Sequence, residues 1–293
     1  MIDLHMHSYY SDDADFAPKY LIQRGNEASL KYMALTDHNS VKGVAEMKTF
    51  GQEQGIKVVS GIEIDCVFES TNLHLLAYGI DESNQDFYEL EKNFKKLALD
   101  AVEPKIKKLR ELGFVLSDAE LYQLAGDNVP QEEQMAELIL NDPKNDHHSL
   151  LLPYRLGGAR SDMPLINFFW DFFGANKPAY VPIEFISLNP AIDLVRANGG
   201  TPILAHPGAN LKHKLELLAP IINVGVAGIE LYSSYHSAEL MAHFRKFALD
   251  HQLLISCGSD FHGKNKPLIK IGSCQYDSKD EEWLIESVAH FLS

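Results

Sequence analysis

Hydrophobic residues recur with two different periods along the 293-residue chain. Residues 2–7 alternate between apolar and polar positions, which is typical of a β-strand with one buried face. Short apolar segments then alternate with amphipathic stretches of helical period as far as residue 81, and again from residue 177. Strands separated by single helices predict parallel βα units. We therefore expect an α/β fold in which seven or so parallel strands form a (β/α) barrel.

The individual elements follow from this alternation. After the opening strand, we predict strands at residues 31–38, 56–64, 73–80, 179–181, 199–207, 228–232 and 253–262. We predict helices between them at residues 18–31, 41–54, 187–198, 237–251 and 281–291. Gly55 directly follows the second of these helices and suits a left-handed C-terminal cap.

A different pattern fills residues 82–176. Apolar residues recur there at helical spacing, at Phe87, Leu90, Phe94, Leu97 and Ala101. This predicts a long amphipathic helix that Pro104 interrupts or kinks. Ser117 and Glu120 fit a capping box that opens a second helix, and a third is expected over 131–140. We predict a barrel formed by residues 1–81 and 177–293, with a helical insertion over 82–176 that caps the substrate.

Composition and charge narrow the possible functions. The chain is 45% hydrophobic and 23% charged, and it has no apolar run near the ~20 residues that a membrane span needs. A formal net charge of −15 argues against a surface that follows long duplex nucleic acid, but not against a small anionic substrate. Three widely spaced cysteines and no signal sequence favour reduced thiols and a cytoplasmic location.

Histidines and carboxylates gather near the ends of the predicted strands. Carboxyl ends of barrel strands meet on one face, so side chains far apart in sequence converge there. The candidate metal ligands are His5, His7, Asp12, His38, Glu63, His74, His206, Asp260 and His262. These nine residues are more than the about four ligands that a single zinc ion binds. They suit two or three divalent ions that share a bridging carboxylate, and zinc, manganese and iron fit equally well.

Such a centre predicts a chemistry. Three carboxylates and three divalent ions leave a positive pocket within an acidic protein, which attracts a phosphate dianion. A metal-activated water can then attack phosphorus directly, without a covalent phospho-enzyme. The sequence therefore predicts a metal-dependent hydrolase of phosphate esters.

The same residues form ordered motifs that resemble those of the polymerase and histidinol phosphatase (PHP) family. The motifs are His5-x-His7, Thr36-Asp37-His38, Glu63 with His74, Ala205-His206-Pro207 and Gly258-Ser-Asp260-Phe-His262. The chain is most similar to stand-alone phosphoesterases with a helical insertion. These include nucleoside 3′,5′-bisphosphate phosphatases, AMP phosphatases and enzymes that trim short RNA from its 5′ end. The resemblance implies a distorted seven-stranded barrel that hydrolyses a nucleotide phosphomonoester or the 5′ end of short RNA.

The resemblance also implies how the ligands are shared. It assigns a first ion to His5, His7, Glu63 and Asp260. Glu63 bridges to a second ion, held by His74 and His206. The third ion is assigned to Asp12, His38 and His262, with Asp13 adjacent to Asp12 in the sequence.

Four further residues complete the predicted site. Arg155 and Arg160 flank a Gly-Gly pair, and their guanidinium groups either bind a second phosphate or are solvated or paired with helices. His236 either assists the leaving group or caps the following helix. Asp37 is expected to serve catalysis through a hydrogen bond that orients the ligands.

Three alternatives remain at this point. A small-molecule phosphatase of the histidinol-phosphate type shares all the metal ligands. A metal-dependent amidohydrolase also opens with His-x-His, but Thr36-Asp37-His38 and the closing Asp-x-His fit it poorly. A non-catalytic metal-binding regulatory domain would lack several ligands, and none is missing. A polymerase domain is disfavoured because the chain ends after the last barrel helix. The exact substrate, the metals and the oligomeric state stay open.

Overall fold

A computed structural model describes residues 1–126 and 128–293. They form two compact units: a barrel unit, Met1–Glu91 with Phe185–Ser293, and a helical unit, Lys92–Glu184. Each unit has its own hydrophobic core. Both boundaries lie further along the chain than the predicted insertion of 82–176. One reason is Phe87, which begins the long helix but is buried in the core of the barrel unit.

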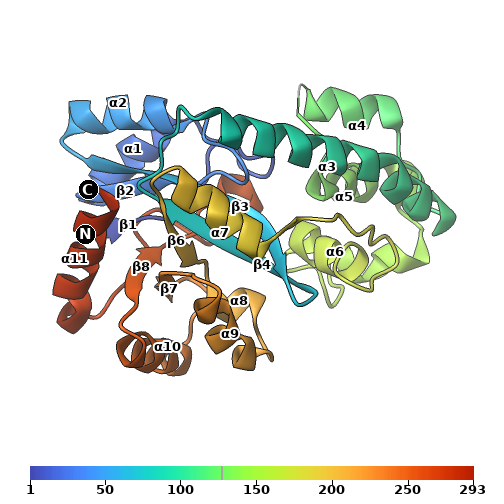
Figure 1. The fold of residues 1–293 in the computed structure, drawn as a ribbon. Helices are drawn as coiled ribbons and strands as arrows, with labels where there is room; N and C mark the ends of the chain where they lie inside the picture. Colours follow the sequence, from blue (N-terminus) through green and yellow to red (C-terminus); the bar gives the residue numbers. More distant parts are fainter. Residues whose placement is uncertain (127) are drawn as a thin grey trace. The chain divides into compact units, whose positions relative to one another are not determined.

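The strands of the barrel unit form one sheet (Figure 1). They are β1 (Ile2–Asp3), β2 (Tyr32–Leu35), β3 (Lys57–Phe68), β4 (Thr71–Tyr78), β5 (Ile186–Ser187), β6 (Thr201–Leu204), β7 (Gly228–Ser233) and β8 (Leu254–Gly258). Their order is β1-β2-β3-β4-β6-β7-β8, with β5 paired to β3. The Leu4 amide donates to the Cys257 carbonyl at 2.9 Å, which brings the chain after β1 beside β8. The seven-stranded path therefore nearly closes, and the predicted barrel is confirmed.

The expectation of a wholly parallel barrel was wrong for β4. This strand runs antiparallel to both β3 and β6. Glu69 and Ser70 alone connect β3 to β4, and both adopt positive φ, at 46° and 61°. Two consecutive residues with positive φ form a tight hairpin, so no crossover helix separates these strands. The strand predicted at 179–181 was also wrong, since this segment is irregular and β5 begins later, at Ile186.

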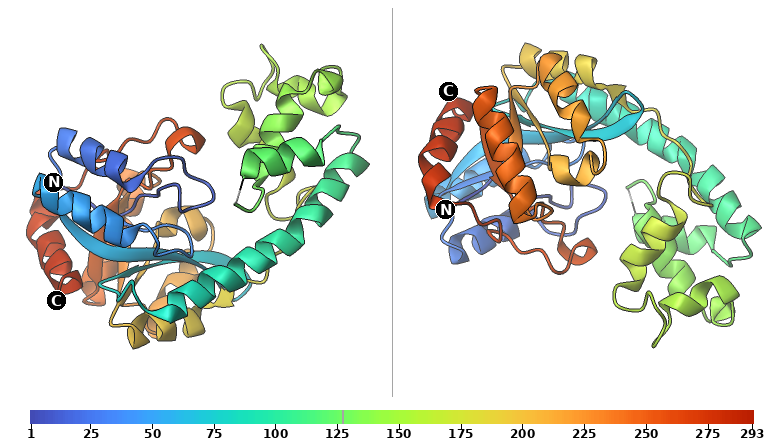
Figure 2. Two further views of the ribbon diagram at one scale, coloured as in Figure 1. Left: turned by 90° about the horizontal axis from the view of Figure 1, so that it is seen from above. Right: turned by 90° about the horizontal axis from the view of Figure 1, so that it is seen from below.

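Helices surround the sheet (Figures 1 and 2). In the barrel unit they are α1 (Pro18–Glu27), α2 (Val44–Gln54), α7 (Leu188–Ala197), α8 (Pro207–Asn210), α9 (Leu218–Asn223), α10 (Ala238–Asp250) and α11 (Glu281–Phe291). Helix α2 packs on β3, α7 on β3, β4 and β6, α10 on β7, and α11 on β8. Gly55 ends α2 with φ of 71°, the left-handed cap that the sequence predicts.

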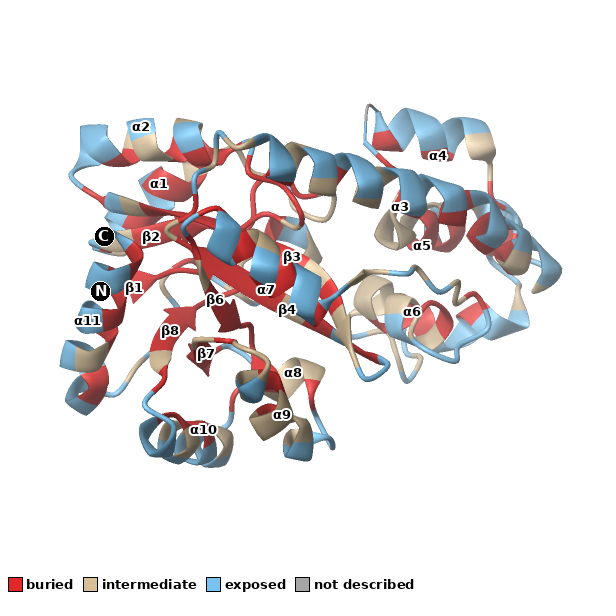
Figure 3. Ribbon diagram, in the orientation of Figure 1, coloured by how far each residue is buried: buried red, intermediate tan, exposed pale blue. Residues whose placement is uncertain are grey.

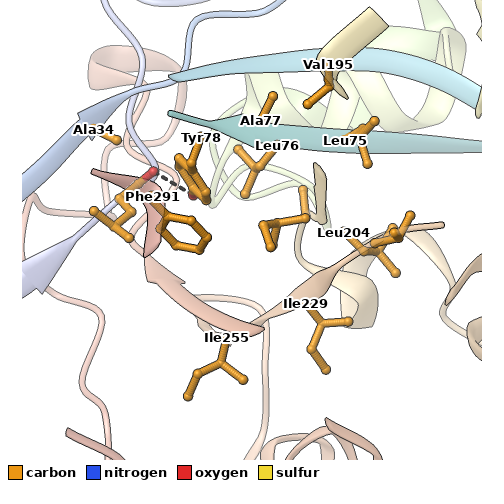
Figure 4. Close-up of a cluster of buried hydrophobic side chains, with 14 of the residues drawn as sticks. Ala34, Leu75, Leu76, Ala77, Tyr78, Val195, Leu204, Ile229, Ile255 and Phe291 are labelled. Carbon is orange, nitrogen blue, oxygen red and sulfur yellow. Dashed lines mark hydrogen bonds between the residues drawn. The ribbon is translucent and has the colours of Figure 1, made fainter. Parts of the chain in front are cut away.

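The core of the barrel unit lies between the strands and these helices. Figure 3 shows the strands largely buried and the outer faces of the helices exposed. Leu75 and Tyr78 of β4 lie near Ile229 of β7 and Phe291 of α11 (Figure 4). The buried Tyr78 hydroxyl donates to the Leu4 carbonyl at 2.9 Å, so its polar atom is satisfied. Each such apolar side chain contributes about 1.5–3 kcal/mol on burial, and together they make a rigid base for the strand ends.

The helical unit contains most of α3 (Gln85–Glu111), with α4 (Asp118–Ala125), α5 (Glu132–Asn141) and α6 (Pro164–Phe172). Helix α3 continues through Pro104 instead of stopping there. Val102 and Ile106, on either side of the proline, are wholly buried in the core of this unit, which holds the helix together. Ser117 caps α4 as predicted, with its hydroxyl accepting from the Glu120 amide. No helix in the described ranges has the length and apolar character to cross a membrane.

Candidate metal centre

The ends of several barrel strands and the hairpin of β3 and β4 bring imidazoles and carboxylates together in three groups. Within each group, one potential ligand atom per residue lies within 4.8 Å of all the others. In the described part of the chain the groups are His5-Glu63-His206-Asp260, His7-Asp13-His38-His262 and His38-Asp65-His74. Eight of the nine residues in the predicted ligand set occur in these groups. Asp12 is the exception, and Asp13 and Asp65 are additional.

Glu63 lies at the centre of the site and is wholly buried. Its Oε2 is 3.0 Å from His5 Nε2, 3.1 Å from His7 Nε2 and 3.5 Å from His38 Nε2. Its Oε1 is 3.0 Å from His74 Nδ1 and 3.2 Å from His206 Nε2. Burial alone would raise the pKa of Glu63, but the surrounding histidines hold it well below its ordinary value. A carboxylate with both oxygens facing imidazoles has the arrangement expected of a bridging ligand.

Asp260 presents its two oxygens to different partners. Oδ1 is 3.2 Å from both His5 Nε2 and His7 Nε2. Oδ2 accepts from the Tyr235 hydroxyl at 2.7 Å and from Lys266 Nζ at 2.5 Å. Asp260 itself has a φ of 58°, which is costly for a residue other than glycine and is typical of functional sites. The carboxylate is therefore fixed on one side and directed to the imidazoles on the other.

Asp13, the neighbour of the predicted ligand Asp12, lies close to two of the histidines. Asp13 Oδ2 lies 3.1 Å from His262 Nε2 and 3.8 Å from His38 Nε2. Residues 9–13 form turns, in which consecutive side chains do not alternate as regularly as they do along a strand. Sequence spacing alone could not decide which of two adjacent carboxylates faces the histidines.

Asp65 is a candidate ligand that the sequence analysis missed. Its Oδ1 lies 3.2 Å from His38 Nδ1 and 3.4 Å from His74 Nε2. Its Oδ2 accepts from the Asn39 amide nitrogen at 2.7 Å, which orients the carboxylate. Asp65 follows Glu63 by two residues on β3, so the strand period places both on one face. That period was the signal that could have identified it.

Glu230 is a second residue that the sequence did not reveal. It contacts two candidate ligands on the side away from the cluster. This wholly buried carboxylate lies on β7 between Ile229 and Leu231. Its Oε1 is 2.9 Å from His5 Nδ1, and its Oε2 accepts from the His206 backbone amide at 2.8 Å. With a proton on Nδ1 of His5, Nε2 carries the lone pair that faces Glu63 and Asp260. A lone carboxylate within an apolar strand was the available sequence signal.

His5 and His7 differ in their affinity for protons. Burial alone would lower the pKa of His5, but Glu63, Glu230 and Asp260 hold it well above its ordinary value. Burial and the neighbouring His262 lower the pKa of His7 to about 4. A histidine must be neutral at the nitrogen that binds a cation, so cation binding at His5 releases a proton.

The donor set fits divalent cations. Every potential ligand is an imidazole nitrogen or a carboxylate oxygen, the types that suit zinc, manganese and iron. Among the described atoms, His206 Nδ1 and Asp13 Oδ1 are buried without a hydrogen-bond partner. Clustered carboxylates at this depth repel one another unless cations compensate them. The burial of the site, its unpartnered ligand atoms and its negative charge all favour bound cations.

Asp37 lies just outside the three groups. It is buried, and its two oxygens accept from the Ser8 amide at 2.6 Å and the Ser8 hydroxyl at 2.8 Å. Burial raises the pKa of Asp37 to about 7. By holding Ser8 it fixes the backbone next to His7, which fits the orienting role expected from the sequence.

His236 has both ring nitrogens engaged within the protein. Nδ1 lies 2.9 Å from the Leu231 carbonyl, and Nε2 accepts from the Gly208 amide at 3.1 Å. The predicted cap of the following helix was wrong, because the Ser237 hydroxyl caps α10 instead. His236 joins β7 to the segment after His206, and in this arrangement it has no free nitrogen for a leaving group.

The two predicted phosphate-binding arginines belong to the helical unit. Arg160 makes two parallel hydrogen bonds of 2.9 Å to the Asp171 carboxylate. Arg155 donates to the Leu140 carbonyl and lies 3.1 Å from Asp146. Both guanidinium groups therefore pair within their own unit, as the alternative interpretation expected.

Comparison with known proteins gives consistent results. The family model described as "PHP domain" matches residues 3–141. A 3′,5′-nucleoside bisphosphate phosphatase from Chromobacterium violaceum is 30% identical over 266 residues, covering 89% of this chain and 87% of the relative. A 5′-3′ exoribonuclease from Haemophilus influenzae is 25% identical over 278 residues, covering 91% of this chain and 94% of the relative.

One solved structure resembles nearly the whole fold. It is an amidohydrolase from Chromobacterium violaceum with bound sulfate. The TM-score is 0.80 at 25% identity, and the match covers 99% of this chain and 96% of the other.

Proposed function

This chain belongs to the PHP family, and on that basis we propose that it removes phosphate from a nucleotide or from the 5′ end of a short RNA. It is a metal-dependent phosphoesterase, a hydrolase of ester bonds. The proposed nucleotides are 3′,5′-bisphosphonucleotides and AMP. Two relatives support this choice, one a nucleoside bisphosphate phosphatase and the other a 5′-3′ exoribonuclease.

The observation that carries the proposal is the environment of Glu63. A wholly buried carboxylate has five imidazole nitrogens within 3.5 Å of its two oxygens. A merely structural ion pair needs one cation, whereas five imidazoles around one carboxylate suit a shared ligand between cations. The alternative of a non-catalytic domain with missing ligands has no support in this arrangement.

The proposed ligands are the predicted residues with Asp13 and Asp65 added. We assign His5, Glu63, His206 and Asp260 to one cation, His7, Asp13, His38 and His262 to another, and His74 with Asp65 to a third. Manganese, zinc and iron all suit these donors. Bound cations supply a water of lowered pKa and positive charge for the phosphoryl oxygens. In this assignment His7 belongs with His38 and His262, not with His5 as the resemblance implied.

The remaining predicted roles are part of the same proposal. Glu230 and Asp37 hold the ligands in place from behind. Arg160, whose side chain is 39% exposed, keeps Nη1 outside its pair with Asp171 and is proposed to bind a second phosphate, whereas Nε and Nη2 of Arg155 are buried. The three cysteines are buried free thiols, which supports a reducing, cytoplasmic location.

A phosphate-release screen combined with metal analysis tests the proposal. Chelator-treated protein is reloaded separately with manganese, zinc and iron, and each form is assayed with adenosine 3′,5′-bisphosphate, AMP, a 5′-phosphorylated short RNA and histidinol phosphate. We expect turnover of at least one nucleotide substrate that depends on added metal. Preferential turnover of histidinol phosphate favours the small-molecule alternative. No turnover of any ester by the metal-loaded protein contradicts the proposal.

A further inference from the structure

We propose that Lys266 binds the phosphoryl group of the substrate, as a positive charge supplied by the chain beside the metal centre. This inference rests on the proposed phosphoesterase function and adds a substrate contact to it. Lys266 lies in the segment after β8, beyond the Asp260-Phe-His262 motif.

The ammonium group of Lys266 lies beside a candidate metal ligand. Lys266 Nζ lies 2.5 Å from Asp260 Oδ2. The other oxygen of the same carboxylate faces His5 Nε2 and His7 Nε2, each at 3.2 Å. A single carboxylate therefore separates the ammonium group from the imidazoles of the centre. A phosphoryl group bound at that centre comes within reach of Nζ.

Lys266 has hydrogen-bonding capacity beyond its pair with Asp260. An ammonium group carries three protons that can each be donated, and the bond to Asp260 uses one. The Lys266 side chain is 30% exposed, so part of it faces solvent, whereas Asp260 is only 2% exposed. Lys266 can thus donate to a phosphoryl oxygen without giving up its pair with Asp260.

Tyr235 also holds Asp260 in place, so Lys266 is free to contact a phosphoryl group. Its hydroxyl donates to the same Oδ2 at 2.7 Å, and Lys266 Nζ lies 5.4 Å from the centre of its ring. The Tyr235 ring also packs edge-on against His206, with centroids 5.4 Å apart. The orientation of Asp260 therefore has a second support, and Lys266 is not needed for that purpose alone.

The side chains predicted to bind phosphate or to assist the leaving group are less suitable. His236 has both nitrogens bonded to backbone groups of the barrel unit. Arg160 holds Asp171 with two of its N–H groups, and Arg155 pairs within the helical unit. Lys266 combines a positive charge, partial exposure and direct contact with a candidate metal ligand.

Lys264 provides a matched control in the same segment. It is 65% exposed, and its Nζ lies 3.5 Å from Asp15. Removing its charge changes the net charge of the protein and of the segment by the same amount as removing that of Lys266. A difference between the two variants therefore reports the position of the charge.

The experiment measures binding of inorganic phosphate to metal-loaded wild type, Lys266→Met, Lys266→Arg and Lys264→Met by isothermal titration calorimetry, with metal content measured in parallel. We expect Lys266→Met to keep its metal ions and bind phosphate roughly 10- to 100-fold more weakly, the range for loss of a charged hydrogen bond. Lys264→Met should match wild type, and Lys266→Arg should recover most of the affinity. If Lys266→Met does not fold, Lys266→Gln provides the same comparison.

Two outcomes would overturn the assignment. Wild-type phosphate affinity in a metal-replete Lys266→Met protein shows that Lys266 makes no such contact. Loss of metal in both Lys266→Met and Lys266→Gln would show that Lys266 only supports Asp260. The proposed function fails separately, if the wild type holds metal and binds phosphate but hydrolyses none of the esters.

Discussion

Glu230 and His5 form a hydrogen bond of 2.9 Å between two wholly buried side chains, Oε1 of the glutamate to Nδ1 of the histidine. The same glutamate holds the backbone amide of His206. One carboxylate on β7 therefore orients two candidate ligands that come from different strands. Carboxylate–histidine pairs of this kind fix the tautomer and the direction of the ligand ring.

We expect Glu230→Gln to weaken metal binding by about 10- to 100-fold, the range for loss of such a supporting residue. The amide keeps the shape of the carboxylate but loses the charge that holds the proton on His5 Nδ1. Competition with a chelator measures the affinity. Glu239→Gln, at an exposed site on α10, is the control. Wild-type affinity in Glu230→Gln would show that His5 is oriented without it.

Variants of Asp12 and Asp13 test which of the two carboxylates binds a cation. Asp13 lies 3.1 Å from His262, and Asp12 is outside the three groups of the described residues. We expect Asp13→Asn to lose one bound ion per chain in quantitative metal analysis, and Asp12→Asn to keep the wild-type content. The reverse pattern would restore the assignment based on sequence spacing.

Asp65 should contribute to cation binding beside His38 and His74. Because its Oδ1 lies within 3.4 Å of a nitrogen on each histidine, Asp65→Asn removes a negative charge that both rings share. We expect an affinity for the most weakly held ion that is lower by about tenfold or more. Stepwise removal of metal by a chelator measures this loss. Glu69→Gln changes an exposed carboxylate on the same hairpin and should leave the affinity unchanged. Equal affinities in the two variants would exclude Asp65 from the centre.

His236 makes stability depend on pH in a defined direction. Burial lowers its pKa from the ordinary value of 6.5. Below pH 6.5, His236 binds a proton in the unfolded chain but stays neutral in the folded chain until the pH reaches its lower folded-state pKa. The free energy of unfolding therefore falls as the pH drops through 6.5 towards the folded-state pKa, and the loss is absent well above 6.5.

Urea denaturation in the presence of a chelator tests this dependence. We compare wild type with His236→Gln, which cannot titrate, at pH values on both sides of 6.5. The stability advantage of wild type should shrink on acidification, with a slope of at most about 1.4 kcal/mol per pH unit for a single group. An advantage that is constant with pH would mean that His236 keeps its ordinary pKa in the folded protein.

The strands and helices of the barrel could be predicted because burial imposes a period on the sequence. The direction of β4 could not, since alternation looks the same in parallel and antiparallel strands. Its turn also lacks the glycine or asparagine that usually marks such a hairpin. Glu69 and Ser70 adopt the positive φ angles instead. Helix α3 was predicted to be interrupted or kinked at Pro104. It continues through the proline, and the buried Val102 and Ile106 on either side hold it in the core of the helical unit.

The candidate site was predictable where ligands end strands, because strand ends must converge in a barrel. Asp65 and Glu230 lie on strands, where the sequence pattern could have identified them, but the positions of Asp13 and Arg160 follow from no such pattern. Asp13 lies in a turn, where neighbouring side chains have no regular direction. Arg160 pairs with Asp171, a partner from another segment of the same unit that no local pattern specifies. Such pairings depend on tertiary packing and follow only from coordinates.

The hairpin of β3 and β4 restricts how this protein can change in length. Glu63 and Asp65 lie on one strand and His74 on the other, and Asp65 pairs directly with His74 across a turn of two residues. A shift of one residue in a β-strand sends every side chain to the opposite face. Single insertions or deletions at this turn would therefore direct His74 away from Glu63, whereas substitutions that accept positive φ would not. Variants of this chain should therefore keep two residues at positions 69–70, although the amino acids at these positions can change.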